Sequence, residues 1–343
     1  MWNSTDPPLV SVLMPVWNGE AFLAEAIESV LAQTLGSFEL IVINDGSTDG
    51  TGEILTGYQH QDPRVHVGTQ ENQGIINALN RGLALARGRY VARLDADDAC
   101  LPERLAVQVG LLERECSLVM AGSECSFVDE AGRQVGFRRL PLDDTSIRWR
   151  MLFDCPFCHS AVILRAETLS RNGLRYSTNA RHAEDYDLWS RLIEYGRCVN
   201  LPQPLVRYRR HSQQTSLAHS AEQNAMATKI SQRNLAKLGL PLADADVRAL
   251  QRLFYGPPAR LTPADVRSVR LMLRAVELFS EQPGMTPEGL WVVRRTWLKH
   301  ILLCILRDPL QLRSPALLGD VLRLAAAQPS ALLPRRVHPV WGQ

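Results

Sequence analysis

The sequence lacks several features that would assign the chain to a common class of protein. No window holds about 18 uninterrupted apolar residues, so no transmembrane helix is predicted. The first nine residues contain Asp6, Pro7 and Pro8 in place of a basic start and an apolar core, so no secretory signal peptide is expected. We therefore expect the seven cysteines to be reduced thiols in a cytosolic protein.

Glycine-rich phosphate-binding motifs are also missing. Neither G-x-G-x-x-G after the first predicted strand nor G-x-x-x-x-G-K-[ST] occurs, which disfavours a Rossmann dinucleotide-binding protein and a P-loop ATPase. An EF-hand counted from Asp45 fails because its twelfth position is Thr56 in place of Glu.

Lysine is scarce, and the net charge of +2 conceals an asymmetry. Residues 1–220 hold 21 basic and 27 acidic residues, whereas residues 221–343 hold 17 basic and 9 acidic residues. All three lysines lie in the second region. This asymmetry suggests two regions with different partners, and the hydrophobic content of 45% allows a sizeable core.

Short apolar runs alternate with helical patterns over the first hundred residues. Strands are predicted at 10–16, 38–43, 64–67 and 90–94, with intervening helices at 20–33, from about 52 to 58, and 75–86. Asn18 is a candidate N-cap, and Gly88 is a candidate helix stop. The alternation predicts an α/β fold with a parallel sheet covered by helices on both faces. Polar clusters follow Val16, Ile43 and Leu94, so we expect one ligand pocket beyond the carboxyl ends of three strands.

The rest of the chain divides near residue 220. Before it, the pattern predicts further helices at 102–115 and 184–195, and strands at 118–128, 135–139, 159–165 and 205–211. After it, the segments rich in Leu, Ala and Arg predict an α-helical region.

Three carboxylates fall within Asp95-Ala96-Asp97-Asp98 at the end of an apolar strand. A divalent hard cation such as Mg²⁺ or Mn²⁺ would relieve their mutual repulsion and accept oxygen ligands. The alternative is an acidic helix N-terminus, because a helix is predicted from Pro102. Two further polar segments are candidates for a functional site. The alternative for segment 44–49 is an ordinary turn, and the alternative for the acidic pair at 184–185 is ordinary helix capping.

Six motifs occur in a fixed order along the chain: Pro15-Val16-Trp17-Asn18, Asn44-Asp45-Gly46-Ser47-Thr48-Asp49, Asn72-Gln73-Gly74, 90–98, 184–189 and Tyr208-Arg209-Arg210-His211. Each alone is unspecific, but the series resembles the inverting glycosyltransferases of family 2, which have a GT-A nucleotide-sugar fold. The resemblance covers roughly residues 8–215. It implies a mostly parallel, Rossmann-like sheet flanked by helices, with the C-terminal helical region outside it.

The resemblance also implies which residues face the donor. The residues that would border the nucleoside or contact the donor are Pro15, Val16, Asn18, Glu20, Asp45, Asp95 and Ala96. Asp45 would recognise a uracil or thymine ring, while its neighbour Asn44 stands where many relatives have a second Asp. Trp17, where Tyr is commoner, is expected either to pack in the core or to stack on the base.

The resemblance assigns the chemistry to later positions. Asp97 would hold the cation that bridges the diphosphate, with His211 nearby, and Asp185 would be the general base. Glu184 would adjust the base or bind acceptor, and the candidate acceptor-side residues are His159, Glu184 and Trp189. His211 could otherwise be a surface histidine of an edge strand.

The segment Cys155-Pro156-Phe157-Cys158-His159 matches the c-type haem attachment pattern, C-x-x-C-H. Attachment requires export, and no distant axial ligand is marked. C-x-x-C alone is at most half a zinc site. We therefore expect the cysteines to be packing residues, with His159 at the start of an acceptor-side strand.

Residues 290–307 place two tryptophans and several aliphatic residues at helical spacing beside Arg294, Arg295 and Lys299. One interpretation is a helix in an anionic membrane surface, and the other is a helix packed on the catalytic domain. Nucleic-acid binding is disfavoured because the basic residues interrupt a broad apolar face.

These observations predict a catalytic domain at 1–220, with a nucleotide-sugar half at about 8–100 and an acceptor half at about 101–215. A helical region at 221–343 follows, which either associates with membrane or packs on the catalytic domain. The predicted enzyme uses Mg²⁺ or Mn²⁺ to transfer sugar from a UDP-sugar, or else from a dTDP- or GDP-sugar, to a saccharide or lipid-linked saccharide. It is expected in the cytoplasm, with peripheral membrane contact left open. The alternatives are a sugar-phosphate nucleotidyltransferase, disfavoured by the missing glycine-rich loop, and a non-catalytic glycan- or membrane-binding module.

Overall fold

The computed structural model describes residues 7–212, 214, 219–255 and 263–307, apart from the side chains of residues 263–266 and 298–307. The chain divides into two compact units. The first comprises Met1–Ile147 and Cys155–Ala227, and the second comprises Arg148–Asp154 and Thr228–Gln343. The roles predicted for regions 1–220 and 221–343 stay predictions.

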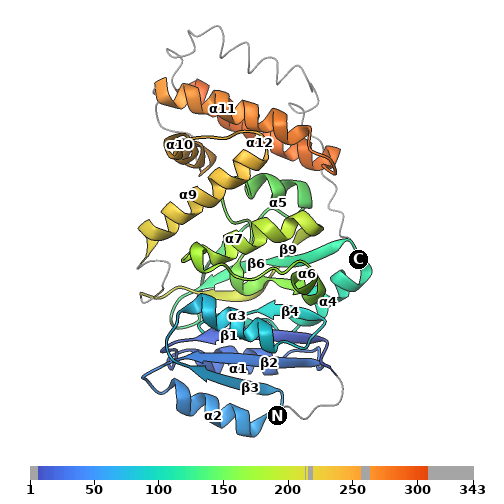
Figure 1. The fold of residues 1–343 in the computed structure, drawn as a ribbon, viewed down its shortest axis with the longest axis vertical. Coiled ribbons are helices and arrows are strands. Elements are labelled where there is room, and N and C mark those ends of the chain that lie inside the picture. The colour runs from blue at the N-terminus through green and yellow to red at the C-terminus, as the bar shows by residue number, and fades with distance from the viewer. Residues whose placement is uncertain (1–6, 213, 215–218, 256–262, 308–343) are drawn as a thin grey trace. The chain divides into compact units, whose positions relative to one another are not determined.

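The first unit begins with four strands that alternate with three helices (Figure 1). Their bounds are β1 (Val10–Val16), α1 (Leu23–Leu31), β2 (Phe38–Asp45), α2 (Thr51–Gln61), β3 (Val65–Gln70), α3 (Ile75–Leu85) and β4 (Tyr90–Arg93). All three pairings in the order β3-β2-β1-β4 are parallel. The carboxyl ends of these strands therefore reach the same edge of the sheet, as the alternating pattern predicts.

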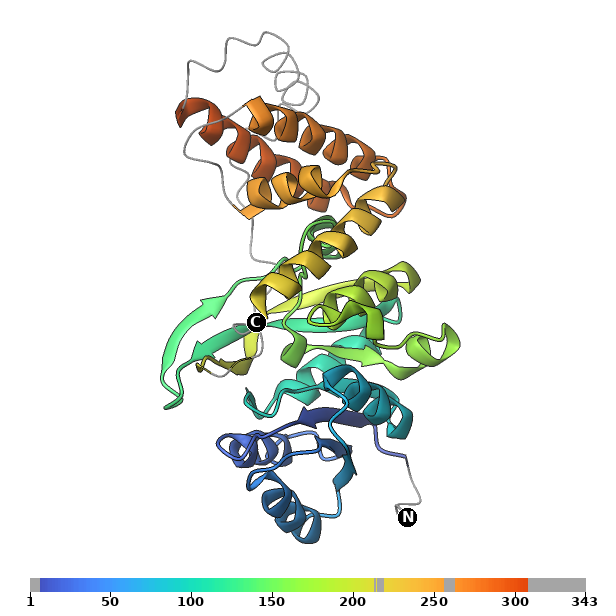
Figure 2. The same ribbon diagram turned by 60° about the vertical axis from the view of Figure 1, so that its left-hand side comes forward.

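The second half of this unit completes a mixed sheet, nine-stranded in the described residues, in the order β3-β2-β1-β4-β8-β6-β9-β5, with β7 paired to β6. Its elements are β5 (Ala99–Cys100), α4 (Arg104–Arg114), β6 (Leu118–Val128), β7 (Gln134–Arg138), α5 (Asp144–Arg150), η1 (His159–Ala161), β8 (Ile163–Arg165), α6 (Ala166–Arg171), η2 (Thr178–Ala180), α7 (Glu184–Leu192), η3 (Ile193–Tyr195) and β9 (Arg197–Arg209). Pairings β4–β8, β6–β8, β6–β7 and β5–β9 are antiparallel, and β6–β9 is parallel. Figure 2 shows the β6–β7 hairpin extending from the sheet.

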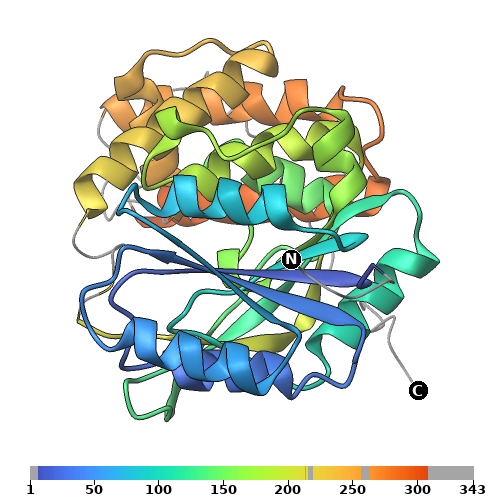
Figure 3. The ribbon, with the colours of Figure 1, turned by 60° about the horizontal axis from the view of Figure 1, so that its bottom comes forward.

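The core of the first unit lies between the sheet and its helices. Every residue of β1 and β2 is buried, as expected for continuous apolar strands covered on both faces. Helix α1 directs Leu23, Ala26, Ile27 and Val30 inward. Figure 3 shows α1 and α2 on one face of the strands and α3 on the other. The predicted α/β fold with a C-terminal helical region is confirmed, and the sheet is mixed beyond β4.

Several local predictions are wrong. Asn18 does not cap α1, which begins after Phe22 without a side-chain cap. Helix α3 ends at Leu85 with Ala86 as its C-cap, and Gly88 is instead required by close packing, because a β-carbon there would lie 2.4 Å from Ser11 N. The predicted strand 159–165 is divided into η1 and a short β8, and β9 begins eight residues before the predicted strand at 205–211.

The described part of the second unit is helical. It contains the end of α9 (Ser220–Lys237) together with α10 (Asp244–Tyr255), α11 (Pro263–Ser280) and α12 (Pro287–Arg307). Trp149 lies at the centre of their core, with ring centroids 5.2 Å from Phe153, 5.2 Å from Phe279 and 6.2 Å from Trp297. Within the described residues, no helix is long and apolar enough to cross a bilayer.

Helix α12 contains the predicted helix 290–307. Val293 and Trp297 are 3% and 1% exposed in the core of the second unit, so these two side chains pack within that unit. Packing of the helix on the catalytic domain stays a prediction. The side chains of Leu298, Ile301 and the other apolar residues beyond them lie outside the described residues. Membrane contact stays a prediction.

Candidate active site

The loops after β1 and β2 are joined by hydrogen bonds. Asn18 N donates to Ser47 Oγ at 2.9 Å, and Thr48 N donates to Asn18 Oδ1 at 2.9 Å. Gly50 N donates to Glu20 Oε2 at 2.7 Å. Asn18 has a φ of 50°, a conformation that Asn tolerates better than most residues. Asn18 and Glu20 are predicted to border the nucleotide-sugar donor. Their hydrogen bonds fix the loop after β1 against the loop after β2.

Asp45 connects these loops to the loop after β3. It is 4% exposed and accepts hydrogen bonds from Gln70 Nε2 at 2.7 Å, Gln73 N at 2.9 Å and Gly74 N at 2.7 Å. The next residue, Gly46, has a φ of 73°. The structure thus gives Asp45 a positioning role, and nucleobase recognition stays a prediction for it.

The remaining donor-side residues of the first loop differ in exposure. Pro15 and Val16 are buried, whereas Trp17 is 57% exposed. The core-packing interpretation of Trp17 is therefore wrong, and its indole is available for stacking. A β-carbon placed on Gly19 would lie 3.9 Å from Ala96 Cβ, so the first loop reaches the aspartate segment after β4.

Asp95 is held by two partners that sequence reasoning missed. Arg93, 2% exposed, pairs with Asp95 Oδ2 and donates through NH1 to Ser160 Oγ at 3.0 Å. Ser160 Oγ donates to the same Asp95 oxygen at 2.8 Å. Burial would raise the pKa of Asp95, but the charge and hydrogen bond of Arg93 outweigh it and lower that pKa. A charged residue inside the apolar run 90–94 was the available signal for Arg93.

Asp97 and Asp98 have the opposite electrostatic environment. Asp97 Oδ2 lies 2.9 Å from His211 Nε2, and burial together with the Asp95 charge raises the pKa of Asp97. Asp98 Oδ1 accepts from Arg209 N at 2.8 Å, while its buried Oδ2 has no hydrogen-bond partner among the described residues. Burial and the neighbouring carboxylates raise the pKa of Asp98 well above its usual value.

This cluster fits a divalent cation. Carboxylate oxygens of Asp95, Asp97 and Asp98 lie within 4.8 Å of one another. One oxygen of Asp98 has no hydrogen-bond partner among the described residues, and burial with the neighbouring carboxylates raises the pKa values of Asp97 and Asp98, so a cation would relieve the repulsion between them. Oxygen-rich donor sets favour Mg²⁺ or Mn²⁺.

Arg209 is a further residue that sequence reasoning missed as an organiser. It is 2% exposed, and its Nε donates to Asp97 O at 3.0 Å. Its NH2 donates to Glu25 Oε2 at 2.5 Å, and its guanidinium lies 4.6 Å from the Phe22 ring centroid. Arg209 therefore ties the aspartate segment to α1, two residues before His211.

The N-terminus of α7 presents a second carboxylate pair. Asp185 Oδ2 accepts from Cys155 Sγ at 3.6 Å, and Asp185 Oδ1 accepts from Tyr186 N at 2.7 Å. Burial raises the pKa of Asp185. Glu184 is 8% exposed, its Oε2 has no hydrogen-bond partner among the described residues, and burial followed by the Asp185 charge raises its pKa to about 7.

The two carboxylate groups influence each other. The positive charge of Arg93 acts to lower the pKa values of Glu184 and Asp185, and the negative charge of Asp95 acts to raise that of Glu184. Both pKa values are nevertheless raised because burial has the largest effect. The structure therefore brings the residues predicted from two distant motifs, after β4 and at α7, into one electrostatic environment.

The predicted acceptor-side aromatic residues form a cluster with Tyr176. His159 Nε2 lies 3.1 Å from Tyr176 OH, and the His159 ring centroid is 5.9 Å from that of Trp189. Burial lowers the pKa of His159 well below its usual value, so its ring is neutral. Trp189 is 0% exposed and supports these rings from behind. Acceptor contact stays a prediction for these residues.

The two cysteines of the C-x-x-C-H segment have separate surroundings. Cys158 is buried in the core of the first unit, in agreement with the packing interpretation. Cys155 instead donates to Asp185, so packing alone does not describe it. Its position beside the predicted base could not be read from a local spacing.

Comparison with known proteins gives consistent matches. The family described as glycosyl transferase family 2 matches residues 11–166. An uncharacterized glycosyltransferase of Haemophilus influenzae is 34% identical over 261 residues, covering 72% of this chain and 81% of the relative. The amylovoran biosynthesis glycosyltransferase AmsE of Erwinia amylovora is 33% identical over 205 residues, covering 59% of this chain and 76% of the relative.

Two solved structures share the fold at low identity. S. aureus TarS 1–349 in complex with UDP-GlcNAc aligns with a TM-score of 0.58 and 18% identity over 94% of this chain and 90% of TarS 1–349. The mannosyltransferase PcManGT from Pyrobaculum calidifontis, in complex with GDP-Man and Mn²⁺, aligns with a TM-score of 0.53 and 16% identity over 95% and 89% of the two chains. At these identities the likeness shows the fold alone.

Proposed function

The chain belongs to glycosyltransferase family 2, and from this premise we propose that it is an inverting, divalent-metal-dependent enzyme whose donor is a UDP-sugar. Family membership makes the chain a glycosyltransferase that acts on nucleotide sugars. It sets aside the nucleotidyltransferase and the non-catalytic module considered from the sequence.

One observation carries the proposal: the first unit contains two carboxylate groups with different surroundings. The group after β4 contains three aspartates and contacts His211, which suits a cation and the diphosphate of the donor. The group at α7 contains Asp185, whose pKa burial raises, which suits a group that must take a proton. A single-displacement transfer requires both functions.

On the donor side, Asp97 and His211 are the proposed cation ligands, together with the oxygens of Asp95 and Asp98. A bound cation would neutralise the negative charge that develops on the diphosphate leaving group. Arg93 fixes the Asp95 carboxylate through its ion pair, and Arg209 fixes the backbone of Asp97. These two arginines thus hold the ligand segment in place.

On the acceptor side, Asp185 is the proposed general base. Its carboxylate takes the proton of the acceptor hydroxyl while that oxygen bonds to the anomeric carbon and the bond to the diphosphate oxygen breaks. The nucleoside diphosphate leaves with the electron pair, and attack from the opposite side inverts the anomeric centre. The hydrogen bonds from Cys155 and Tyr186 orient the two oxygens of Asp185.

The nature of the substrates rests on the comparisons and the first loop. TarS was solved with UDP-GlcNAc, and AmsE is named for amylovoran biosynthesis. A UDP-sugar donor and a saccharide or lipid-linked saccharide acceptor in envelope polysaccharide assembly agree with these names. Exposed Trp17 and buried Asp45 are the proposed contacts to the base.

The proposal is tested by donor binding and turnover of the full chain. Thermal shift with Mn²⁺ or Mg²⁺ and a panel of UDP-, dTDP- and GDP-sugars identifies the donor, because a ligand that binds only the folded state raises apparent stability. Transfer to saccharide acceptors is followed by nucleoside diphosphate release, and NMR of the product gives the anomeric configuration. We expect a UDP-sugar, metal-dependent release and inversion.

The Asp185→Asn variant separates chemistry from binding. It should bind donor as the wild type does and lose transfer by about 10²-fold or more, because the amide cannot take the proton. Glu194→Gln, which removes an exposed carboxylate shortly after α7, is the control for loss of charge. Retention of configuration, or unchanged transfer by Asp185→Asn, would contradict the mechanism.

A further inference from the structure

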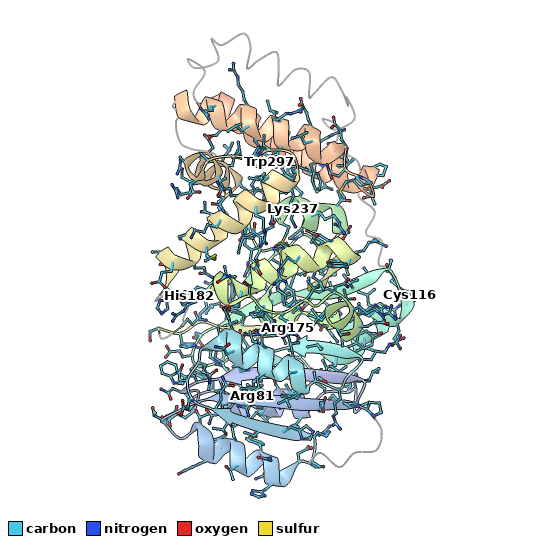
Figure 4. All side chains as sticks on the ribbon, in the orientation of Figure 1. Arg81, Cys116, Arg175, His182, Lys237 and Trp297 are labelled. Atoms are coloured by element: carbon cyan, nitrogen blue, oxygen red, sulfur yellow. The ribbon has the colours of Figure 1, made fainter. Side chains whose placement is uncertain are left out.

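A second group of potential metal ligands lies outside the donor and acceptor groups described above. His182 precedes α7, whereas His219 and Glu222 lie at the beginning of α9, and the potential ligand atoms of all three lie within 4.8 Å of one another. All three residues belong to the first unit. Figure 4 labels His182 beside the N-terminal end of α9.

The geometry of this group is compact. Glu222 Oε2 lies 3.0 Å from His182 Nε2 and 3.1 Å from His219 Nδ1. The two imidazole rings are stacked, with centroids 4.3 Å apart and planes inclined by 13°. In a tetrahedral zinc site with Zn–N bonds of about 2.1 Å, neighbouring donor atoms are about 3.4 Å apart. The two distances to Glu222 are therefore close to those of such a site. Because the ring planes are nearly parallel, one imidazole has to rotate before both nitrogens point to the same ion.

His182 is poorly satisfied without an ion. Its side chain is 11% exposed, and its buried Nε2 forms no well-directed hydrogen bond among the described residues, although Glu222 is near. Burial lowers the pKa of His182, and the charges of His219 and Arg181 lower it further, against the effect of Glu222. A neutral imidazole is the form that binds a metal. The backbone at His182 also has a φ of 67°, which is uncommon for a residue other than glycine.

The types of ligand atom distinguish His182, His219 and Glu222 from the aspartates after β4. Two imidazole nitrogens and one carboxylate favour Zn²⁺ or a similar transition metal, whereas the aspartate cluster favours Mg²⁺ or Mn²⁺. The two groups would therefore bind different ions.

We propose that His182, His219 and Glu222 bind a zinc-class divalent cation at a site separate from the donor-binding cation. The ion would join the first turn of α9 to the turn three residues before Asp185. A structural ion there would stabilise the N-terminus of α7, which carries the proposed base. Water or a further residue would complete the coordination.

The test uses the full chain with the aspartate site weakened by Asp97→Asn. After treatment with chelator, this variant is titrated with Co²⁺, whose visible absorption reports coordination by nitrogen and oxygen ligands. We expect one equivalent bound and displacement by Zn²⁺. Adding Glu222→Gln or His219→Gln should weaken Co²⁺ binding by about tenfold or more and remove the rise in Tm on adding Zn²⁺.

The controls make the outcome decisive. His60→Gln removes an exposed histidine of α2 and should leave Co²⁺ binding unchanged. Glu222 is 66% exposed, so its substitution should not prevent folding, and circular dichroism checks this. The proposal is overturned if the Asp97→Asn protein binds no Co²⁺, if folded Glu222→Gln and His219→Gln bind it equally well, or if the spectrum shows thiolate ligation.

Discussion

The raised pKa of Glu184 gives the molecule a pH-dependent stability that one substitution should remove. Glu184 is 8% exposed, and burial followed by the charge of Asp185 raises its pKa from 4.5 to about 7. The unfolded chain releases this proton near pH 4.5, but the folded protein keeps it until about pH 7. The stabilisation is therefore complete at low pH and is lost as the pH rises between these values.

The size of the effect follows from the shift. A shift of about 2.5 pKa units corresponds to about 3 kcal/mol, because each unit is worth 1.36 kcal/mol. Integration between pH 5 and pH 8 gives about 2.5 kcal/mol, since part of the loss occurs below pH 5. Glu184→Gln keeps the shape and neutrality of the protonated acid but cannot ionise. The variant should thus gain about 2.5 kcal/mol relative to the wild type over this pH range.

Urea denaturation of both proteins at pH 5, 6, 7 and 8 measures this difference. Titrating groups that do not interact with Glu184 act equally on both proteins and cancel in the comparison. Glu194→Gln, which removes an exposed carboxylate shortly after α7, controls for loss of charge alone. A stability difference that stays constant within about 0.5 kcal/mol from pH 5 to pH 8 would refute the raised pKa of Glu184.

Three other changes test separate parts of the molecule. Asp97→Asn should weaken donor binding in Mn²⁺ by about tenfold or more while leaving metal-free binding unchanged, as measured by calorimetry; an equal loss without Mn²⁺ would contradict the ligand role. Gly46→Ala should lower the free energy of unfolding by about 1–3 kcal/mol, because Gly46 has a φ of 73° and a β-carbon there would lie 2.7 Å from Asn72 N. Gly36→Ala is the control and should be nearly neutral, because no atom lies within 4 Å of a β-carbon at that position. Trp297→Ala should destabilise the second unit by about 3–5 kcal/mol, because it removes a buried indole from the core of that unit. An unchanged Tm together with a loss of liposome sedimentation would instead favour membrane contact.

The sequence predicted those parts of the fold that depend on local pattern. Strands β1 and β6 have the predicted bounds, because an apolar run bounded by turn residues needs no distant partner to be recognised. The contact between Ser160 and Asp95 depends instead on the antiparallel register of β4 and β8, in which Ala92 faces Ile163. No spacing along the chain encodes that register.

Two kinds of local signal also misled the predictions. Asn18 is a residue type that commonly caps helices, but its side chain accepts from Thr48 N in the loop after β2, and α1 has no side-chain cap. Gly88 has the composition of a helix stop, but the backbone of Ser11 excludes any larger residue there. In both cases tertiary contacts decide the role of a residue whose local preference allows several.

The surroundings of the site's carboxylates explain how several acidic side chains can be buried close together. Arg93 keeps Asp95 ionised, whereas burial and neighbouring charges favour the protonated forms of Asp98 and Glu184. This distribution limits the charge repulsion within the cluster before any ligand binds. Asp97 and Asp185 each have one oxygen directed to a side-chain partner, His211 in one case and Cys155 in the other. Burial raises the pKa of both carboxylates, so a cation at Asp97 and a proton at Asp185 would each offset the cost of burying a negative charge. The same electrostatics therefore suit the two proposed functions.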